Sequence, residues 1–256
     1  MQTGAITQYI DVAQLALYAF WIFFAGLIYY LHQEDKREGY PLESDRSDRV
    51  SVQGFPPMPE PKTFLLRDGS TVSVPNDKRD TRAINGTPSG NWLGAPMEPN
   101  GNPMLAGVGP GAYAQRADVP DLTLENTPRI VPLRADTAFG VASQDTDPRG
   151  LPVFGADGTQ GGTVRDVWVD RSEMLFRYLE VVVPVAGGSR NVLLPINFSR
   201  INSRGVNVDS ILGAHFVDVP TTRNPDQVTL LEEEKIMAYY GAGTLYATSG
   251  RQEPLI

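Results

Sequence analysis

The stretch VAQLALYAFWIFFAGLIYYL, residues 12–31, decides the fold of this chain, because it runs for twenty residues without a charged side chain. At a rise of 1.5 Å per residue, about twenty helical residues span about 30 Å, the thickness of the hydrocarbon core of a bilayer. Backbone N–H and C=O groups in lipid need partners within the same element, so this segment is expected to be helical. A buried helix of a soluble domain is usually shorter or has a polar face. We therefore predict one membrane-spanning helix at residues 12–31.

The charges around this helix predict its direction. Basic residues are absent before it and follow it at Lys36, Arg37, Arg46 and Arg49. Because basic residues gather on the cytoplasmic side of membrane helices, residues 1–11 are expected outside the cytoplasm and the long remainder inside it. The helix is expected to begin near Asp11, to continue to about residue 38 and to end at Gly39. A cleaved signal peptide would need a basic region before a shorter apolar core.

One face of the predicted helix carries mostly small side chains. It consists of residues at spacings of three and four, namely Ala16, Ala19, Phe23, Gly26 and Tyr30. Small residues let helix backbones approach closely in lipid, where hydrophobicity alone does not drive association. Ala and Gly are also common in membrane helices by chance. We nonetheless predict that this stripe packs against other membrane helices.

The composition excludes several classes of function. The 256-residue chain has a net charge of −8, which argues against binding to nucleic acid. It contains no cysteine, and its two histidines, His32 and His215, are far apart in the sequence, so a structural zinc site is not expected. No nucleophile-elbow motif and no glycine-rich phosphate loop is present. We therefore expect neither a metal or cofactor bound by this chain nor a catalytic centre, and we expect it not to be an enzyme.

The sequence after the apolar helix divides into three parts by composition and residue pattern. Residues 39–129 are rich in Gly, Pro and mixed charges, so they are expected to run extended over a surface, with a hairpin near residues 63–75 around Asp68-Gly69. The tract 76–111 is expected to lack regular structure and to lie along this chain's own barrel or along another chain. Residues 130–245 show short β-prone runs separated by tight turns, which indicate a small antiparallel barrel or sandwich. A capping box at Thr229 and Glu232 begins one helix that is expected to end at Gly241, and residues 246–256 are expected to form a loose tail.

Several blocks resemble one known family along nearly the whole chain, in order. They are EDKREGYPL, PKTF, NPML, VGPGAY, IVPLR, DPRGLPV, VWVDRSE, RYLEV, LLEEEK and YATS. With the apolar helix before them, they make the chain similar to the H subunits of purple-bacterial photosynthetic reaction centres. The resemblance implies one transmembrane helix followed by a mainly β cytoplasmic domain that contains a PRC-type antiparallel barrel and one C-terminal helix.

The family's biology gives further expectations. The resemblance implies a single-pass protein of the bacterial inner, intracytoplasmic membrane with a periplasmic N-terminus. Its partners would be the L and M subunits, with a cytochrome subunit, the light-harvesting antenna and membrane lipids as further neighbours. The H subunit would cap the cytoplasmic side of L and M, stabilise the complex and assist proton transfer to the secondary quinone. Bacteriochlorophyll, bacteriopheophytin, quinones and non-haem iron would be bound by the partner subunits.

The resemblance also assigns candidate proton-transfer residues. The family's internal acid cluster carries over onto Glu173, with Arg177 beside it as a compensating cation and Asp170 in the same block. Alignment of the flanking blocks adds Asp121 and Glu233. Such carboxylates are expected to share protons and to titrate as a unit.

The point of proton uptake differs from the family pattern. Some members have histidines where this chain reads TLENT at residues 123–127, with Glu125 as its one titratable group. Asp118, Asp121 and Glu125 are a candidate acidic funnel in their place.

Two alternatives from other classes remain open at this stage. One is a membrane-anchored PRC-barrel protein that acts in assembly or as a scaffold without a role in proton transfer. The other is a membrane-tethered hydrolase, which is disfavoured because the sequence offers no recognisable nucleophile and base. A copurifying complex that absorbs as bacteriochlorophyll would distinguish the reaction-centre function from both.

Overall fold

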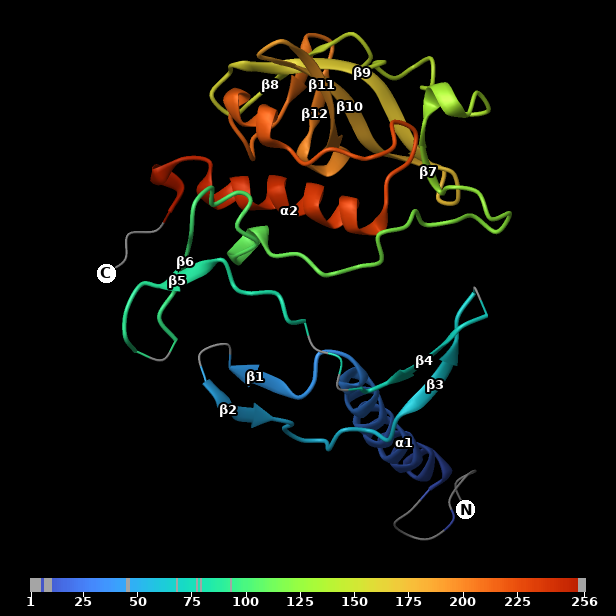
Figure 1. Ribbon diagram of the computed structural model, residues 1–256. Coiled ribbons are helices and arrows are strands. Elements are labelled where there is room, and N and C mark those ends of the chain that lie inside the picture. Colours follow the sequence, from blue (N-terminus) through green and yellow to red (C-terminus); the bar gives the residue numbers. More distant parts are fainter. Residues whose placement is uncertain are drawn as a thin grey trace. The chain divides into compact units, whose positions relative to one another are not determined.

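The computed structural model describes residues 6, 11–44, 47–67, 69–76, 78, 80–92 and 94–252 (Figure 1). For residues 43, 44 and 47–52 it describes the backbone alone. The chain divides into two compact units, Met1–Thr81 and Arg82–Ile256. Each unit is built around its own elements and is treated separately below.

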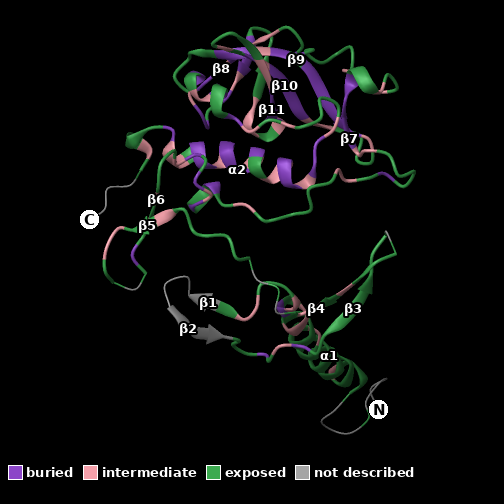
Figure 2. Cartoon of the chain, viewed as in Figure 1, coloured by how far each residue is buried: buried purple, intermediate pink, exposed green. Residues whose placement is uncertain are grey.

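The first unit begins with the apolar helix α1, Val12–Glu34, which continues as a short 3₁₀ turn at Asp35–Arg37. The Asp11 carboxylate caps it by accepting a hydrogen bond of 2.8 Å from the backbone N–H of Gln14, so the predicted start is confirmed. The helix is long and apolar enough to cross a membrane, with a mean hydropathy of 1.8. No residue of α1 is buried within the chain (Figure 2). Its apolar surface therefore needs cover from lipid or from other helices.

Two small hairpins follow α1. Strands β1 (Leu42–Ser44) and β2 (Ser47–Val52) pair antiparallel, as do β3 (Lys62–Leu65) and β4 (Thr71–Val74). The second hairpin lies where the sequence predicts one, although Asp68 of its expected turn is outside the described residues. The first was not predicted, because the mixed charges of residues 43–49 show no apolar alternation.

The second unit contains a seven-stranded sheet. Its order is β11-β10-β9-β8-β13-β12, and β7 pairs with the far end of β9. The strands are β7 (Ile130–Pro132), β8 (Pro152–Phe154), β9 (Gln160–Asp170), β10 (Leu175–Val185), β11 (Gly188–Pro195), β12 (Arg200–Asn202) and β13 (Gly205–Asn207). The predicted mainly β domain is confirmed, and one strand pair differs from the antiparallel arrangement expected from the sequence. The chain returns along the sheet so that β13 lies parallel to β8, and among the described strands the order does not close on itself.

The core of this unit lies between the curved sheet and helix α2, Leu230–Tyr246 (Figures 1 and 2). Its largest fully buried side chains include Trp168 of β9, Leu179 of β10 and Tyr239 and Tyr240 of α2. The long hairpin of β9 and β10 carries five buried valines, Val164, Val167, Val169, Val181 and Val183. A rigid hairpin of this kind is well suited to hold side chains at its ends in fixed positions.

The predicted capping box of α2 is confirmed. The Thr229 hydroxyl accepts from the backbone N–H of Glu232 at 3.1 Å, and the Glu232 carboxylate accepts from the backbone N–H of Thr229 at 2.9 Å. The predicted end at Gly241 is wrong, since the helix continues to Tyr246. A Cβ atom on Gly241 would lie 2.8 Å from the Pro110 carbonyl oxygen, and this close packing explains the glycine.

The predicted loose tail also begins later than expected. Ala247 is buried, and the Arg251 guanidinium donates to the backbone carbonyls of Asp209, Ser210 and Gly243. Residues 253–256 of the expected tail are outside the described part of the chain.

The tract 76–111 is partly ordered on this chain. It forms the short antiparallel pair β5 (Gly86–Pro88) and β6 (Met97–Pro99), which was not expected. Met104 and Val108 are buried, and Gly111 packs on Ala242 of α2. The compact unit therefore begins at Arg82, and this part of the tract lies along the chain's own β domain, which is one of the two alternatives that the sequence left open.

Candidate functional site

A tight turn between β9 and β10 begins the candidate site. The carboxylate of Asp170, the last residue of β9, accepts hydrogen bonds of 3.0 Å from the backbone N–H groups of Ser172 and Glu173. Met174 completes the reversal with a φ of +55°. The DRSE sequence is thus folded by its own aspartate, and this turn holds Glu173 beside Asp170.

Arg129 lies at the centre of the site. Its Nη1 is 3.1 Å from Oδ2 of Asp121, its Nε is 3.0 Å from Oδ1 of Asp170, and its Nη2 contacts both Asp170 and Glu173. The register explains this position, because Ile130 of β7 pairs directly with Asp170. The segment before β7 therefore places Arg129 at the end of β9.

Arg177 provides the second cation. Its Nη2 donates to Oε2 of Glu173 at 2.6 Å, and its Nε lies 3.3 Å from Oδ2 of Asp170. The structure thus joins three carboxylates and two guanidiniums, Asp121, Asp170, Glu173, Arg129 and Arg177, into what we call the Arg129 cluster. Because carboxylates outnumber guanidiniums, it carries one net negative charge when all are ionised.

Asp170 and Glu173 have different environments within the Arg129 cluster. The Asp170 side chain is 1% exposed, whereas that of Glu173 is 46% exposed. Burial alone would raise the pKa of the Asp170 carboxyl, but the hydrogen bonds from Arg129 and from two backbone N–H groups outweigh it and hold the pKa below its usual range. In turn, Asp170 raises the pKa of Arg129. Asp170 is therefore a fixed anion at neutral pH.

Glu233 lies in the first turns of α2 and is held by a different partner. The Tyr178 hydroxyl donates to its Oε2 at 2.7 Å. Burial raises the pKa of the Glu233 carboxyl, while Tyr178, Arg116 and Arg177 act in the opposite direction and Asp121 adds to the increase. Charges of the Arg129 cluster thus influence the pKa of Glu233, although Glu233 is not one of the carboxylates bound to Arg129.

The next candidate acid, Glu125, is exposed in a turn where the Thr123 and Thr127 hydroxyls are 2.9 Å apart. Asp118 contacts Arg223 and the Thr229 hydroxyl at the start of α2. Asp121, the third acid of the expected funnel, binds Arg129.

Sequence reasoning missed Arg129, Tyr178 and Arg116. The signal for Arg129 was its place directly before the β-prone run IVPLR, but its partners depend on the pairing of β7 with β9. Tyr178 looked like an ordinary inward-facing strand residue. Its hydroxyl acquires a role only when α2 packs across β10.

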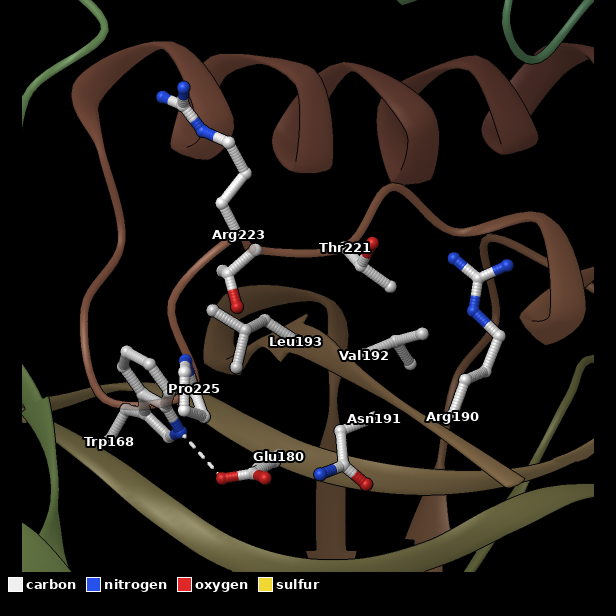
Figure 3. A pocket seen from close by; sticks show the side chains of 10 residues that line it. Trp168, Glu180, Arg190, Asn191, Val192, Leu193, Thr221, Arg223 and Pro225 are labelled. Atoms are coloured by element: carbon white, nitrogen blue, oxygen red, sulfur yellow. Dashed lines mark hydrogen bonds between the residues drawn. The ribbon is translucent and has the colours of Figure 1, made fainter. Parts of the chain in front are cut away.

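A second charged group borders a pocket of about 250 Å³ that is lined by residues of β9, β10 and β11 and of the segment before α2 (Figure 3). Glu180, which is 2% exposed, accepts from the Trp168 indole N–H at 3.1 Å and contacts Arg134 and Arg165. Arg134 also binds Asp166 at 3.1 Å. Every oxygen of Glu180 has a donor, so this group is a paired buried charge that stabilises the strands. Among the described residues, no group of His, Cys, Asp or Glu is arranged to bind a metal ion.

The predicted helix-packing stripe lies exposed on α1. The described residues leave open space around Gly26, since a Cβ atom there would meet nothing within 4 Å. Other residues of α1 contact the chain itself, since the Tyr29 and Phe55 rings lie 5.8 Å apart and Phe55 and Pro56 line a pocket with His32. Within the stripe, the Tyr30 ring lies 5.6 Å from the ammonium group of Lys62.

Two family models match the chain. One, described as "Photosynthetic reaction centre, H-chain N-terminal region", matches residues 4–135, which is just over half of the chain. The other, described as "PRC-barrel domain", matches residues 141–215. The Arg129 cluster joins the two regions, since Asp121 and Arg129 come from the first and Asp170, Glu173 and Arg177 from the second.

Proposed function

The chain belongs to the family of photosynthetic reaction centre H chains, a structural subunit of the reaction centre, and we propose that it assists proton transfer to the secondary quinone. In this proposal it caps the cytoplasmic side of the L and M subunits, which bind the pigments, and stabilises their complex. It performs no catalysis of its own. The observation that carries the proton-transfer role is the Arg129 cluster, in which a half-exposed carboxyl group lies beside a buried fixed anion.

The membrane position follows from α1. A helix of this length and hydropathy with no residue buried in its own chain suits a single span of the bacterial inner membrane. The basic residues Lys36 and Arg37 at its end favour a periplasmic N-terminus and a cytoplasmic barrel domain. The exposed stripe with Gly26 at its centre would then face helices of the L and M subunits. The cytochrome subunit, antenna and lipids would be further neighbours.

The pigments and redox groups belong to the partners in this proposal. Bacteriochlorophyll, bacteriopheophytin, quinones and non-haem iron would be bound by L and M. Reduction of a quinone to a quinol takes up two protons, and a site buried within a membrane complex can receive them only through groups that bridge it to the cytoplasm. The H chain would supply part of that bridge.

The Arg129 cluster has properties that suit proton transfer. Asp170 remains ionised, and its fixed charge favours cations near the turn. Glu173 is exposed enough to exchange protons with water, and it is held by Arg129 and Arg177 in one orientation. A relay group needs both access and fixed geometry, because a proton moves only across a hydrogen bond or a bridging water. Glu173 is therefore the proposed relay residue.

The test replaces Glu173 by glutamine in the intact complex. Glu173→Gln keeps the size of the side chain but cannot exchange a proton near neutral pH. Flash-induced quinone turnover should then show a modest change in the first electron transfer and about a 10-fold or larger slowing of the second, proton-coupled transfer. Small weak acids such as azide should partly restore the rate.

Asp147→Asn is the matched control. The Asp147 carboxylate is 43% exposed and is paired with Arg149, much as Glu173 is 46% exposed and paired with arginines. It should leave both transfers unchanged. Kinetics of Glu173→Gln that match the wild type from pH 6 to 9 would refute the relay role and leave the chain as an assembly subunit.

A further inference from the structure

An open pocket of about 580 Å³ lies between β10 and α2 in the second unit. Its walls combine apolar side chains with six charged or polar groups, Arg116, Arg177, Tyr178, Asn197, Glu233 and Glu234. A pocket of this volume holds several water molecules, and its polar groups offer partners for them. It also borders the Arg129 cluster, because Arg177 lines the pocket and binds Glu173.

The Tyr178 side chain is held by burial, by its strand pairing and by one hydrogen bond. The residue is 4% exposed and lies in the middle of the long β9–β10 hairpin, paired with Trp168 on one side and Pro195 on the other. Its hydroxyl donates to Oε2 of Glu233 at 2.7 Å. Burial raises the pKa of Tyr178 well above its usual range, so the hydroxyl stays protonated and acts only as a donor.

We propose that Tyr178 is a positioning residue, which holds Glu233 at the wall of the pocket as a carboxyl group that stores a proton beside the relay residue Glu173. The inference deepens the proposed function and rests on it. It assigns a role to Tyr178 and connects Glu233, already a candidate acid, with the Arg129 cluster through the pocket.

Opposing influences act on the protonation of Glu233. Burial and the negative charge of Asp121 favour the protonated acid, whereas Tyr178, Arg116 and Arg177 favour the carboxylate. Glu234 adjoins on the same helix, 3.6 Å from Arg116. A group in such a balance changes protonation when a neighbouring charge changes.

Arg177 supplies the connection between the two carboxyl groups. It binds Glu173 at 2.6 Å and acts electrostatically on Glu233. When Glu173 gains a proton, Arg177 loses an anionic partner and its charge acts more strongly on Glu233, which favours release of the stored proton. When Glu173 releases its own proton again, the ion pair between Glu173 and Arg177 is restored. The two sites would thus exchange protons in opposite phase.

The experiment measures proton uptake per flash against pH in the intact reaction-centre complex, with a pH-indicator dye. Tyr178→Phe removes the donor that stabilises the Glu233 carboxylate but keeps the ring. The part of the uptake profile that belongs to Glu233 should shift by about one to two units to higher pH, as expected for loss of a hydrogen bond to a charged group. A profile that superimposes on the wild type would overturn the inference.

Two further variants distinguish a positioning role of Tyr178 from general damage to the fold. Tyr239→Phe is the matched control, since Tyr239 is also buried and its hydroxyl donates at 2.7 Å to a backbone carbonyl, that of His215. It should leave the profile unchanged. In a Glu233→Gln background, Tyr178→Phe should cause no additional shift, and a shift there would show that the tyrosine does not act through Glu233.

The failure of this inference and that of the proposed function give different results. If Glu173→Gln slows the second electron transfer while Tyr178→Phe leaves the uptake profile unchanged, the storage role alone is wrong. If Glu173→Gln has no effect, the relay role fails, whereas a shifted profile in Tyr178→Phe would still assign a titrating carboxyl group to the pocket.

Discussion

Removal of Arg129 should destabilise the second unit more than removal of any surface arginine. Arg129 neutralises Asp170, whose carboxylate is 1% exposed, through its Nε and Nη2 atoms. It also joins the segment before β7 to the end of β9 through Asp121 and Glu173. Arg129→Ala would leave a buried carboxylate with Arg177 at 3.3 Å and two backbone N–H donors as its remaining partners.

The size of the effect follows from these remaining contacts. Loss of one partner from a buried ion pair usually costs about 3–5 kcal/mol, because the other charge stays buried. The three donors that remain on Asp170 reduce this, and Arg129 itself is 24% exposed, so we expect a loss of about 2–3 kcal/mol. For a unit of this size, such a loss lowers the midpoint of thermal unfolding by about 4–12 °C.

Thermal unfolding of the purified chain in detergent, followed by near-ultraviolet circular dichroism, measures this change. Arg149→Ala is the control. The Arg149–Asp147 ion pair has an N–O distance of 2.6 Å, close to the 2.9 Å of the Arg129–Asp170 pair, but both of its side chains are more than 40% exposed. It should cost less than about 1 kcal/mol. Combining Arg129→Ala with Asp170→Asn should recover part of the stability. Equal midpoints for Arg129→Ala and Arg149→Ala would refute the reasoning.

Two further predictions concern acid stability and association. Folding lowers the pKa of Asp170, so its stabilising contribution is complete above its ordinary pKa of 3.8 and is lost as pH falls through the lower folded value. Asp170→Asn should therefore flatten the dependence of stability on pH below about pH 4. An unchanged curve in acid denaturation would contradict this. Gly26→Leu should reduce the fraction of chain that stays with the complex after detergent extraction, since it separates helix backbones, while Ala25→Leu on another face should not. Full retention of Gly26→Leu would exclude the stripe as a contact.

Local signals in the sequence were sufficient for the parts of the fold that depend on one segment. The start of α1 follows from an acidic cap at Asp11 before an uncharged run, and the start of α2 follows from the Thr229 and Glu232 side chains. Each cap is formed by residues within four positions of one another. Tertiary packing supports them but does not decide where they begin.

Features that depend on distant segments were not visible in the sequence. Gly241 looked like a helix terminator, because a glycine after an amphipathic run usually ends a helix. In the fold it allows α2 to approach Pro110, more than a hundred residues earlier in the chain. The parallel pairing of β13 with β8 and the binding of Arg129 to Asp170 likewise depend on how separate segments meet. Residue type and spacing carry no information about such contacts.

Three of the four acids expected to act together show how burial and hydrogen-bond donors give carboxyl groups different chemistry. Asp170 is the most buried, yet two arginines and two backbone N–H groups keep it ionised. Glu173 has the same two arginines but remains half exposed, so water reaches it. Glu233 is partly buried with one neutral donor, and its pKa rises. The proposed proton delivery requires a fixed anion, an accessible relay and a store, and one residue class can supply all three because the fold gives each carboxyl group a different set of donors.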